Sequence, residues 1–209
     1  MTTKEFVILE KRLVSSFPDF AIKGRMMFVP PADHTLRGFH FEPSGFSRKK
    51  FYVNMFFMPL CIPAKHVHFT FGHRVGHGWD EDETNLETTL MAEMQKDVPF
   101  LLRLRTPRDV ANALEPLTKP NEAGYVNPHC YEALAYALVQ AGEATAAANV
   151  IDTLLRRVNP TVAWEGEVAS RARLVRDKLL EKPEEVHEQL TAWEAETIRN
   201  LGMENFSHV

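Results

Sequence analysis

Hydrophobic residues recur along the first part of the chain at the spacing of a helix and then at the spacing of strands. Across residues 4–17 they stand three and four positions apart, at Phe6, Leu9, Leu13 and Phe17, which predicts an amphipathic helix with one buried stripe. From residue 25 the period changes to two, as expected when alternate side chains face a core. The short connections favour an antiparallel meander of four strands, predicted at residues 25–29, 36–42, 51–60 and 66–75.

From about residue 84 onward the pattern is helical throughout. Three helix starts are marked by polar residues: Thr84, in a capping box with Glu87, Thr106 before a proline, and Asn127 before another. A glycine or an Asn-Pro pair marks several helix ends. We therefore expect five to seven helices, the last four at residues 127–140, 144–158, 162–181 and 183–201.

Residues 128–160 resemble a single tetratricopeptide-like helical hairpin. No second unit follows at a fixed period, so the sequence predicts a stack of helical hairpins and not a repeat array. Stacks of this kind serve as scaffolds or peptide-binding surfaces. The positions expected to be buried are Tyr131, Leu134, Ala135, Leu138, Ala147, Ile151 and Leu154.

Two tryptophans of the helical part, Trp164 and Trp193, stand at positions whose spacing predicts a place in the core. An exposed tryptophan at either position would instead mark an interface anchor.

The predicted fold class is therefore α+β. An N-terminal helix packs on a four-stranded, mainly antiparallel sheet, and a C-terminal stack of helices follows. Two parts are expected, residues 1–83 and 84–209, packed together as one unit.

Composition fits a globular protein of the cytoplasm. The chain has 209 residues, of which 44% are hydrophobic and 25% charged. Its most apolar stretch, residues 51–63, is too short to cross a bilayer, and its first residues do not resemble a secretory signal. Cys61 and Cys130 are isolated, which favours two reduced thiols over a disulfide.

The net charge of −4 conceals an uneven distribution along the chain. Residues 1–78 hold 11 Lys+Arg and 5 Asp+Glu, whereas residues 79–209 hold 13 and 23. A basic sheet part and an acidic helical part would attract different partners, or each other.

Four histidines within residues 66–77 raise the question of a metal site. On a strand, His66 and His68 would share one face and could converge on zinc or iron. A third ligand would come from His40 or Glu42 on the second strand, or from His77 or Asp80 in the loop that follows. No HExxH motif accompanies the pair, and the alternative interpretation is a polar strand face. No cofactor is therefore expected unless this pair binds an ion.

Charged clusters are the other candidate sites, and all of them are candidates for binding a partner. The acidic candidates are Asp80, Glu81, Asp82 and Glu83 before the helical part, and Glu184, Glu185 and Glu188 near the C-terminus. The basic candidates are Arg48, Lys49 and Lys50, in a turn near aromatic residues, a combination found in nucleic-acid binders.

The stretch "GFHFEPSGFSRKKFYVNMFFMPL", followed by "HFTFGHRVG", resembles the core of an uncharacterised bacterial family, the domain-of-unknown-function family 4304. The resemblance covers residues from about 36 to 76. It implies a small bacterial accessory protein, of which some lie near toxin systems as candidate immunity proteins, and it brings no catalytic residue. The residues that carry it are Phe51, Tyr52, Val53, Asn54 and Met55, then Arg74 and Gly76.

The expected function is a bacterial cytosolic protein-interaction module of immunity or adaptor type, with a protein partner and without catalytic activity. One alternative is a metal-dependent enzyme that uses His66 and His68. A second alternative is a nucleic-acid binder that uses the basic side of the sheet, although no nucleic-acid module is recognisable. The sequence does not indicate an oligomeric state.

Overall fold

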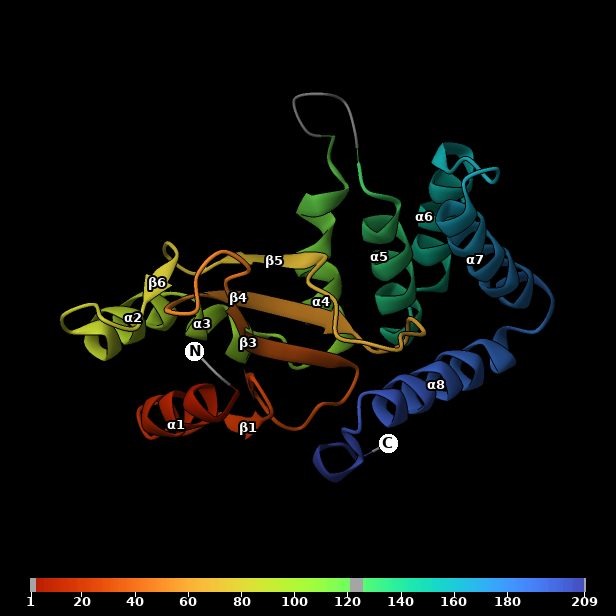
Figure 1. Cartoon of the computed structure of the whole chain (residues 1–209). Coiled ribbons are helices and arrows are strands. Elements are labelled where there is room, and N and C mark those ends of the chain that lie inside the picture. Colours follow the sequence, from red (N-terminus) through yellow and green to blue (C-terminus); the bar gives the residue numbers. More distant parts are fainter. Residues whose placement is uncertain (1–2, 121–125, 209) are drawn as a thin grey trace. The chain divides into compact units, whose positions relative to one another are not determined.

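The computed structural model describes residues 3–120 and 126–208 and has the α+β class expected from the sequence (Figure 1). It divides into two compact units, each built from separate segments of the chain. Within the described residues, the first unit comprises 3–58, 67–103 and 203–208, and the second comprises the remainder. This division differs from the boundary expected at residue 83, because the helices of residues 86–103 and the C-terminal segment both belong to the unit that contains the sheet.

The first unit is an antiparallel sheet with helices. Its strands lie in the order β1-β2-β3-β4-β5, and β6 pairs with β4. The four expected strands are present, and β1 and β6 were not expected. The elements are α1 (Thr3–Val14), β1 (Ala21–Lys23), β2 (Met26–Phe28), β3 (Thr35–Pro43), β4 (Lys50–Pro59), β5 (Phe71–Arg74), β6 (Trp79–Asp80), α2 (Leu86–Gln95), α3 (Val98–Arg103) and the 3₁₀ turn η2 (Glu204–Phe206).

One core joins the three helices of this unit to one face of its sheet. The stripe predicted for α1 is buried there, and Phe6 packs edge-on against Phe51 with ring centroids 5.6 Å apart. Leu90 from α2 and Leu101 from α3 enter the same cluster. Arg37 of β3 also fastens α3, because its Nε donates to the carbonyl oxygen of Leu101 at 3.1 Å.

Two glycines permit the central strands to approach closely. A Cβ added at Gly38 would lie 2.1 Å from the carbonyl oxygen of Met27, and one added at Gly72 would lie 2.1 Å from that of Met55. Any other residue at these positions would push the paired strand away.

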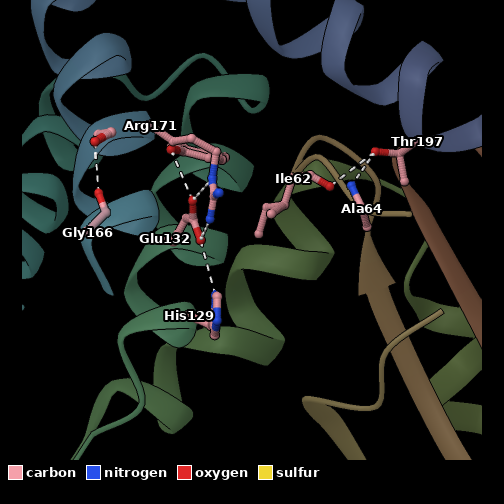
Figure 2. Close-up of polar contacts among 9 residues, drawn as sticks. Ile62, Ala64, His129, Glu132, Gly166, Arg171 and Thr197 are labelled. Atoms are coloured by element: carbon pink, nitrogen blue, oxygen red, sulfur yellow. Dashed lines mark hydrogen bonds and ion pairs between the residues drawn. The ribbon is translucent and has the colours of Figure 1, made fainter. Parts of the chain in front are cut away.

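The fourth expected strand is shorter than predicted and begins only at Phe71. Residues 59–66 belong to the second unit, where helix α8 (Pro183–Asn200) binds their backbone. Thr197 Oγ1 donates to the Ile62 carbonyl at 3.2 Å and accepts from the Ala64 N–H at 3.2 Å (Figure 2). Residues 66–70 form no strand, so His66 and His68 lie outside the sheet.

The C-terminal segment, residues 203–208, binds the rest of the first unit through Asp33. The carboxylate of Asp33 accepts from the Ser207 hydroxyl at 3.0 Å and from the His208 backbone N–H at 2.8 Å, and it pairs with the His208 ring at 2.8 Å. Burial alone would raise the pKa of Asp33, but these hydrogen bonds together hold it below its ordinary value. Phe206 packs edge-on against Phe28, with centroids 5.0 Å apart.

The second unit is a stack of helices in which consecutive helices pack against each other, as expected. Figure 1 shows α5, α6 and α7 side by side. All seven positions predicted to be buried in the hairpin of α5 and α6 are buried. The remaining elements are α4 (Pro107–Leu114), the 3₁₀ turn η1 (Glu115–Thr118), α5 (Pro128–Gln140), α6 (Ala144–Arg157) and α7 (Ala163–Glu181).

Two of the three predicted helix starts are confirmed. Thr106 and Asp109 form a capping box at α4, and the Asn127 side chain accepts from the His129 N–H at α5. The prediction for Thr84 is wrong, because α2 starts after Asn85, a left-handed residue with φ 63° and no side-chain cap. No helix in the described part of the chain is long and apolar enough to span a bilayer.

Candidate functional site

The most unusual chemistry of the second unit is a carboxylate buried in an apolar helix. Glu132 of α5 is fully buried, and its neighbours from Cys130 to Val139 are buried as well. Arg171 of α7 binds both carboxylate oxygens, with Nε at 2.7 Å and Nη2 at 3.1 Å (Figure 2). A bidentate ion pair of this kind fixes both the separation and the register of α5 and α7.

A surface aromatic pair lies at the outer end of this ion pair. The Nδ1 atom of His129 lies 3.2 Å from Glu132 Oε2. Trp164, in the first turn of α7, stacks on the His129 ring with centroids 5.3 Å apart and an interplanar angle of 27°. Trp164 is nevertheless 40% exposed, so its expected place in the core is wrong. The Glu132–Arg171 ion pair and His129 therefore hold the exposed indole of Trp164 in a defined position.

Two buried groups near Glu132, the hydroxyl of Tyr136 and the thiol of Cys61, stay protonated. Burial, helped by the charge of Glu132, raises the pKa of Tyr136 well above its ordinary value, and its hydroxyl lies 3.4 Å from Glu132 Oε1. Burial, reinforced by Glu194, also raises the pKa of Cys61 far above its ordinary value. A thiol held in this way is a poor nucleophile and a poor metal ligand.

A second buried carboxylate, Glu194 of α8, lies one turn before Thr197. The Gln140 side chain donates to its Oε2 atom at 3.0 Å. Trp193 packs on Tyr136 with centroids 5.8 Å apart and is half-buried. These contacts complete a polar seam, defined as Glu132, Arg171, Gln140 and Glu194, that joins α5, α7 and α8.

The polar seam orders the helices and adds little net stability. Desolvation of a buried ion pair roughly offsets its Coulomb attraction, but removing one partner costs about 3–5 kcal/mol. The seam is therefore suited to holding α5 and α7 in a fixed register, and with them the stacking of Trp164 of α7 on His129 of α5.

The histidines predicted as metal ligands are not brought together. His66 belongs to the second unit, whereas His68, His40 and His77 belong to the first. The His40 ring packs at a tilt against Phe69, with centroids 4.8 Å apart, and burial, with the charge of Arg25, lowers the pKa of His40. His77 lies against Trp79 at 4.5 Å and pairs with Glu83 at 3.5 Å. Among residues 3–120 and 126–208, no three His, Cys, Asp or Glu side chains are placed to hold a metal ion.

The first acidic cluster and the basic turn contact each other. Lys49 forms an ion pair with Asp82, and Lys50 lies opposite Asp80 in the backbone register of β4 and β6. Glu83 accepts from the Asp80 N–H at 3.0 Å, and Glu81 is exposed. Arg48 lies in the same turn. Charges that appear as separate clusters in the sequence thus form a mixed surface.

The second acidic cluster lies at the start of α8. Hydrogen bonds from Lys178 and Lys182 lower the pKa of Glu185 to about 2. Glu184 and Glu188 are exposed. The start of α8 therefore presents the exposed carboxylates of Glu184 and Glu188 beside Glu185, whose negative charge is offset by two lysines.

The uneven charge along the sequence does not separate the two units. The first unit holds 12 Lys+Arg and 13 Asp+Glu, and the second holds 12 and 15. The reason is that the acidic residues 79–103 belong to the first unit together with the basic strands. A basic part and an acidic part therefore do not exist as separate bodies.

The polar seam was missed in the sequence, although one signal for it is present. Glu132 is the single acid in a helix that is otherwise apolar on almost every face, and a charge there requires a buried partner. Nothing local identifies that partner as Arg171, 39 residues away.

A scan against protein-family models, a search of curated proteins and a search of solved structures found no match for this chain. The resemblance to the domain-of-unknown-function family 4304 therefore stays a prediction.

Proposed function

We propose that the protein is a cytosolic protein-interaction module of immunity or adaptor type, and that Trp164 is the anchor of its interface. The observation that carries this proposal is the exposure of Trp164, 40%, combined with its fixed stacking on His129. Tryptophan is the residue type most enriched among interface hot spots. A ring already held in place loses little conformational entropy when a partner covers it.

The remaining surface of α7 and α8 supplies the chemistry of the partner. Glu184 and Glu188 are exposed at the start of α8, the helix that follows. A partner that fits this surface has an apolar pocket for the indole and basic residues for these two carboxylates.

The two alternative functions gain no support from the arrangement of the side chains. The proposed metal ligands divide between the two units. The basic turn has its central lysine paired with Asp82. Of the three functions, the interaction module is the one for which a preorganised surface is present.

The test is site-specific photo-cross-linking in the source cell. A benzophenone amino acid replaces Glu167, an exposed residue of α7 three positions after Trp164, in one variant and Thr145, an exposed residue of α6, in the control. We expect position 167 to give one discrete adduct that untagged wild-type protein competes away and a Trp164→Ala protein does not. Equal adduct patterns at both positions, or the absence of a discrete adduct at 167, would overturn the proposal.

A further inference from the structure

The first unit carries an exposed aromatic tip at the turn between β3 and β4. Phe46 is 98% exposed, the highest value among the large hydrophobic residues of the described chain. The turn that presents it is ordered by hydrogen bonds, since the Ser44 hydroxyl accepts from the Phe46 N–H at 3.2 Å and the Ser47 hydroxyl accepts from the Lys49 N–H at 3.3 Å. Residues 44–50, named the tip here, contain three basic residues and no acid.

An acidic groove lies on the same unit, between α1 and the segment that leads into α2. Its volume is about 500 Å³. Apolar side chains of Ile8, Leu9 and Leu86 line it, and Ile8 is 43% exposed. The charged residues that line it are Glu5, Glu81, Glu83 and Glu87, with Arg12 as the one cation.

The tip and the groove are complementary in both charge and polarity. An apolar ring flanked by cations matches an apolar floor flanked by carboxylates, and the groove falls within the 300–1,000 Å³ range of ligand pockets. Arg12 offsets only one of the four carboxylates, because it pairs with Glu87 at 2.5 Å, and the groove therefore stays acidic.

The tip and the groove are also neighbours on one molecule. The Glu81 N–H donates to the Lys49 carbonyl at 3.0 Å, and Asp82 pairs with the Lys49 side chain. The tip nevertheless leaves Phe46 in solvent, so it does not fill the groove of its own chain. Two complementary halves side by side on one surface are what a two-fold interface requires, since each half meets the other half of the second copy.

We propose that a second copy of this chain occupies the groove, and that two chains exchange their tips reciprocally in a symmetric dimer. The Phe46 side chain enters the groove of the other copy, and Arg48 and Lys50 face its carboxylates. Each exchange buries one phenylalanine and its immediate neighbours, an area at the low end of specific interfaces. The dimer is therefore weak, with a dissociation constant on the order of micromolar, and it is weakened by salt.

Sedimentation velocity of the full chain between 1 and 200 µM tests this proposal. We expect a concentration-dependent dimer that Phe46→Ser abolishes and Ile8→Lys abolishes, while Leu180→Ser, an exposed apolar residue outside the tip and the groove, leaves it unchanged. Phe46 and Ile8 are exposed enough for their substitution to leave the fold intact, which circular dichroism verifies. A monomer at every concentration overturns the proposal, as does a dimer that ignores both substitutions.

A cross-linking experiment distinguishes exchange from other dimers. Gly45→Cys is sterically open, because nothing lies within 4 Å of a Cβ there, and Thr88 lines the groove. A mixture of Gly45→Cys and Thr88→Cys chains should form a heterodimer with a short bis-maleimide, and the native thiols are both buried. Failure of that cross-link contradicts exchange. Exchange is also contradicted if Phe46→Ser causes the loss of a bound protein other than a second copy of this chain. Trp164→Ala should not affect dimerisation, so this proposal and the proposed function fail independently.

Discussion

Single residues carry the most unusual energetics of this protein. Glu10 of α1 is fully buried, and neither of its carboxylate oxygens has a hydrogen-bond partner among the described residues. Burial raises its pKa to about 8, against the opposing effect of Arg25. The Glu10 carboxyl group therefore stays protonated at neutral pH, because its apolar surroundings disfavour the charged form.

The first prediction concerns the pH dependence of unfolding. Between pH 4.5 and about 8 the folded state keeps a proton on Glu10 that the unfolded state releases, so the free energy of unfolding should fall as pH rises through this range and level off above it. The loss is roughly 3–5 kcal/mol at 1.36 kcal/mol per pKa unit. Urea denaturation at several pH values should show that Glu10→Met removes this slope. Glu5→Met, an exposed glutamate of the same helix, should retain it, and an unchanged slope in Glu10→Met would show that burial does not govern the titration.

The second prediction concerns the ion pair of Glu132 and Arg171. Arg171→Met leaves a fully buried carboxylate without its cation, so the free energy of unfolding should fall by about 3–5 kcal/mol. A Glu132→Leu/Arg171→Met double variant should recover most of that loss, because no buried charge then remains. Denaturant titration of the three proteins measures both effects. A double variant as unstable as Arg171→Met alone would mean that the pair contributes more than compensation of its own burial.

At the scale of elements, the local pattern predicted two of the three capped helix starts but not where the fourth strand begins. Thr106 and Asn127 were identified correctly because capping depends on neighbours three residues away or fewer. The start of β5 was misplaced because the alternating pattern extends over residues 66–75, whereas only 71–74 find partners on β4, and such pairing is not contained in the local pattern. Trp164 was misplaced for a related reason, since helical spacing gives a face of the helix and not its coverage.

The third prediction tests the bonds that hold residues 59–66. Thr197→Val removes the hydroxyl but keeps the volume of this fully buried side chain, leaving the Ile62 carbonyl and the Ala64 N–H without that partner. We expect a loss of about 1–3 kcal/mol in the free energy of unfolding and faster amide exchange at Ala64. Thr161→Val, at an exposed threonine that binds Asn159, should change stability by less than about 0.5 kcal/mol. Equal effects at the two positions would contradict the role of Thr197.

At the scale of the whole molecule, the class of fold followed from the period of the hydrophobic pattern, but the organisation of the chain did not. The two units interleave in sequence, since residues 59–66 join the helical unit and residues 203–208 return to the sheet. Charge counted along the sequence therefore predicted a basic and an acidic part that the units do not have. The candidate site was likewise accessible only through tertiary contacts, because Glu132, His129 and Trp164 acquire a shared role only when α5 and α7 pack.

Trp164 anchors a protein interface in this account, and the most direct measurement is the affinity for the protein cross-linked beside it, at position 167. Calorimetric titration should show that Trp164→Ala weakens binding by at least about 30-fold, or roughly 2 kcal/mol. Leu174, 41% exposed on the same helix and turned by about 80° from Trp164, is the matched control. Leu174→Ala should change the affinity by less than about threefold. Equal affinities of the Trp164→Ala and Leu174→Ala proteins would contradict the account.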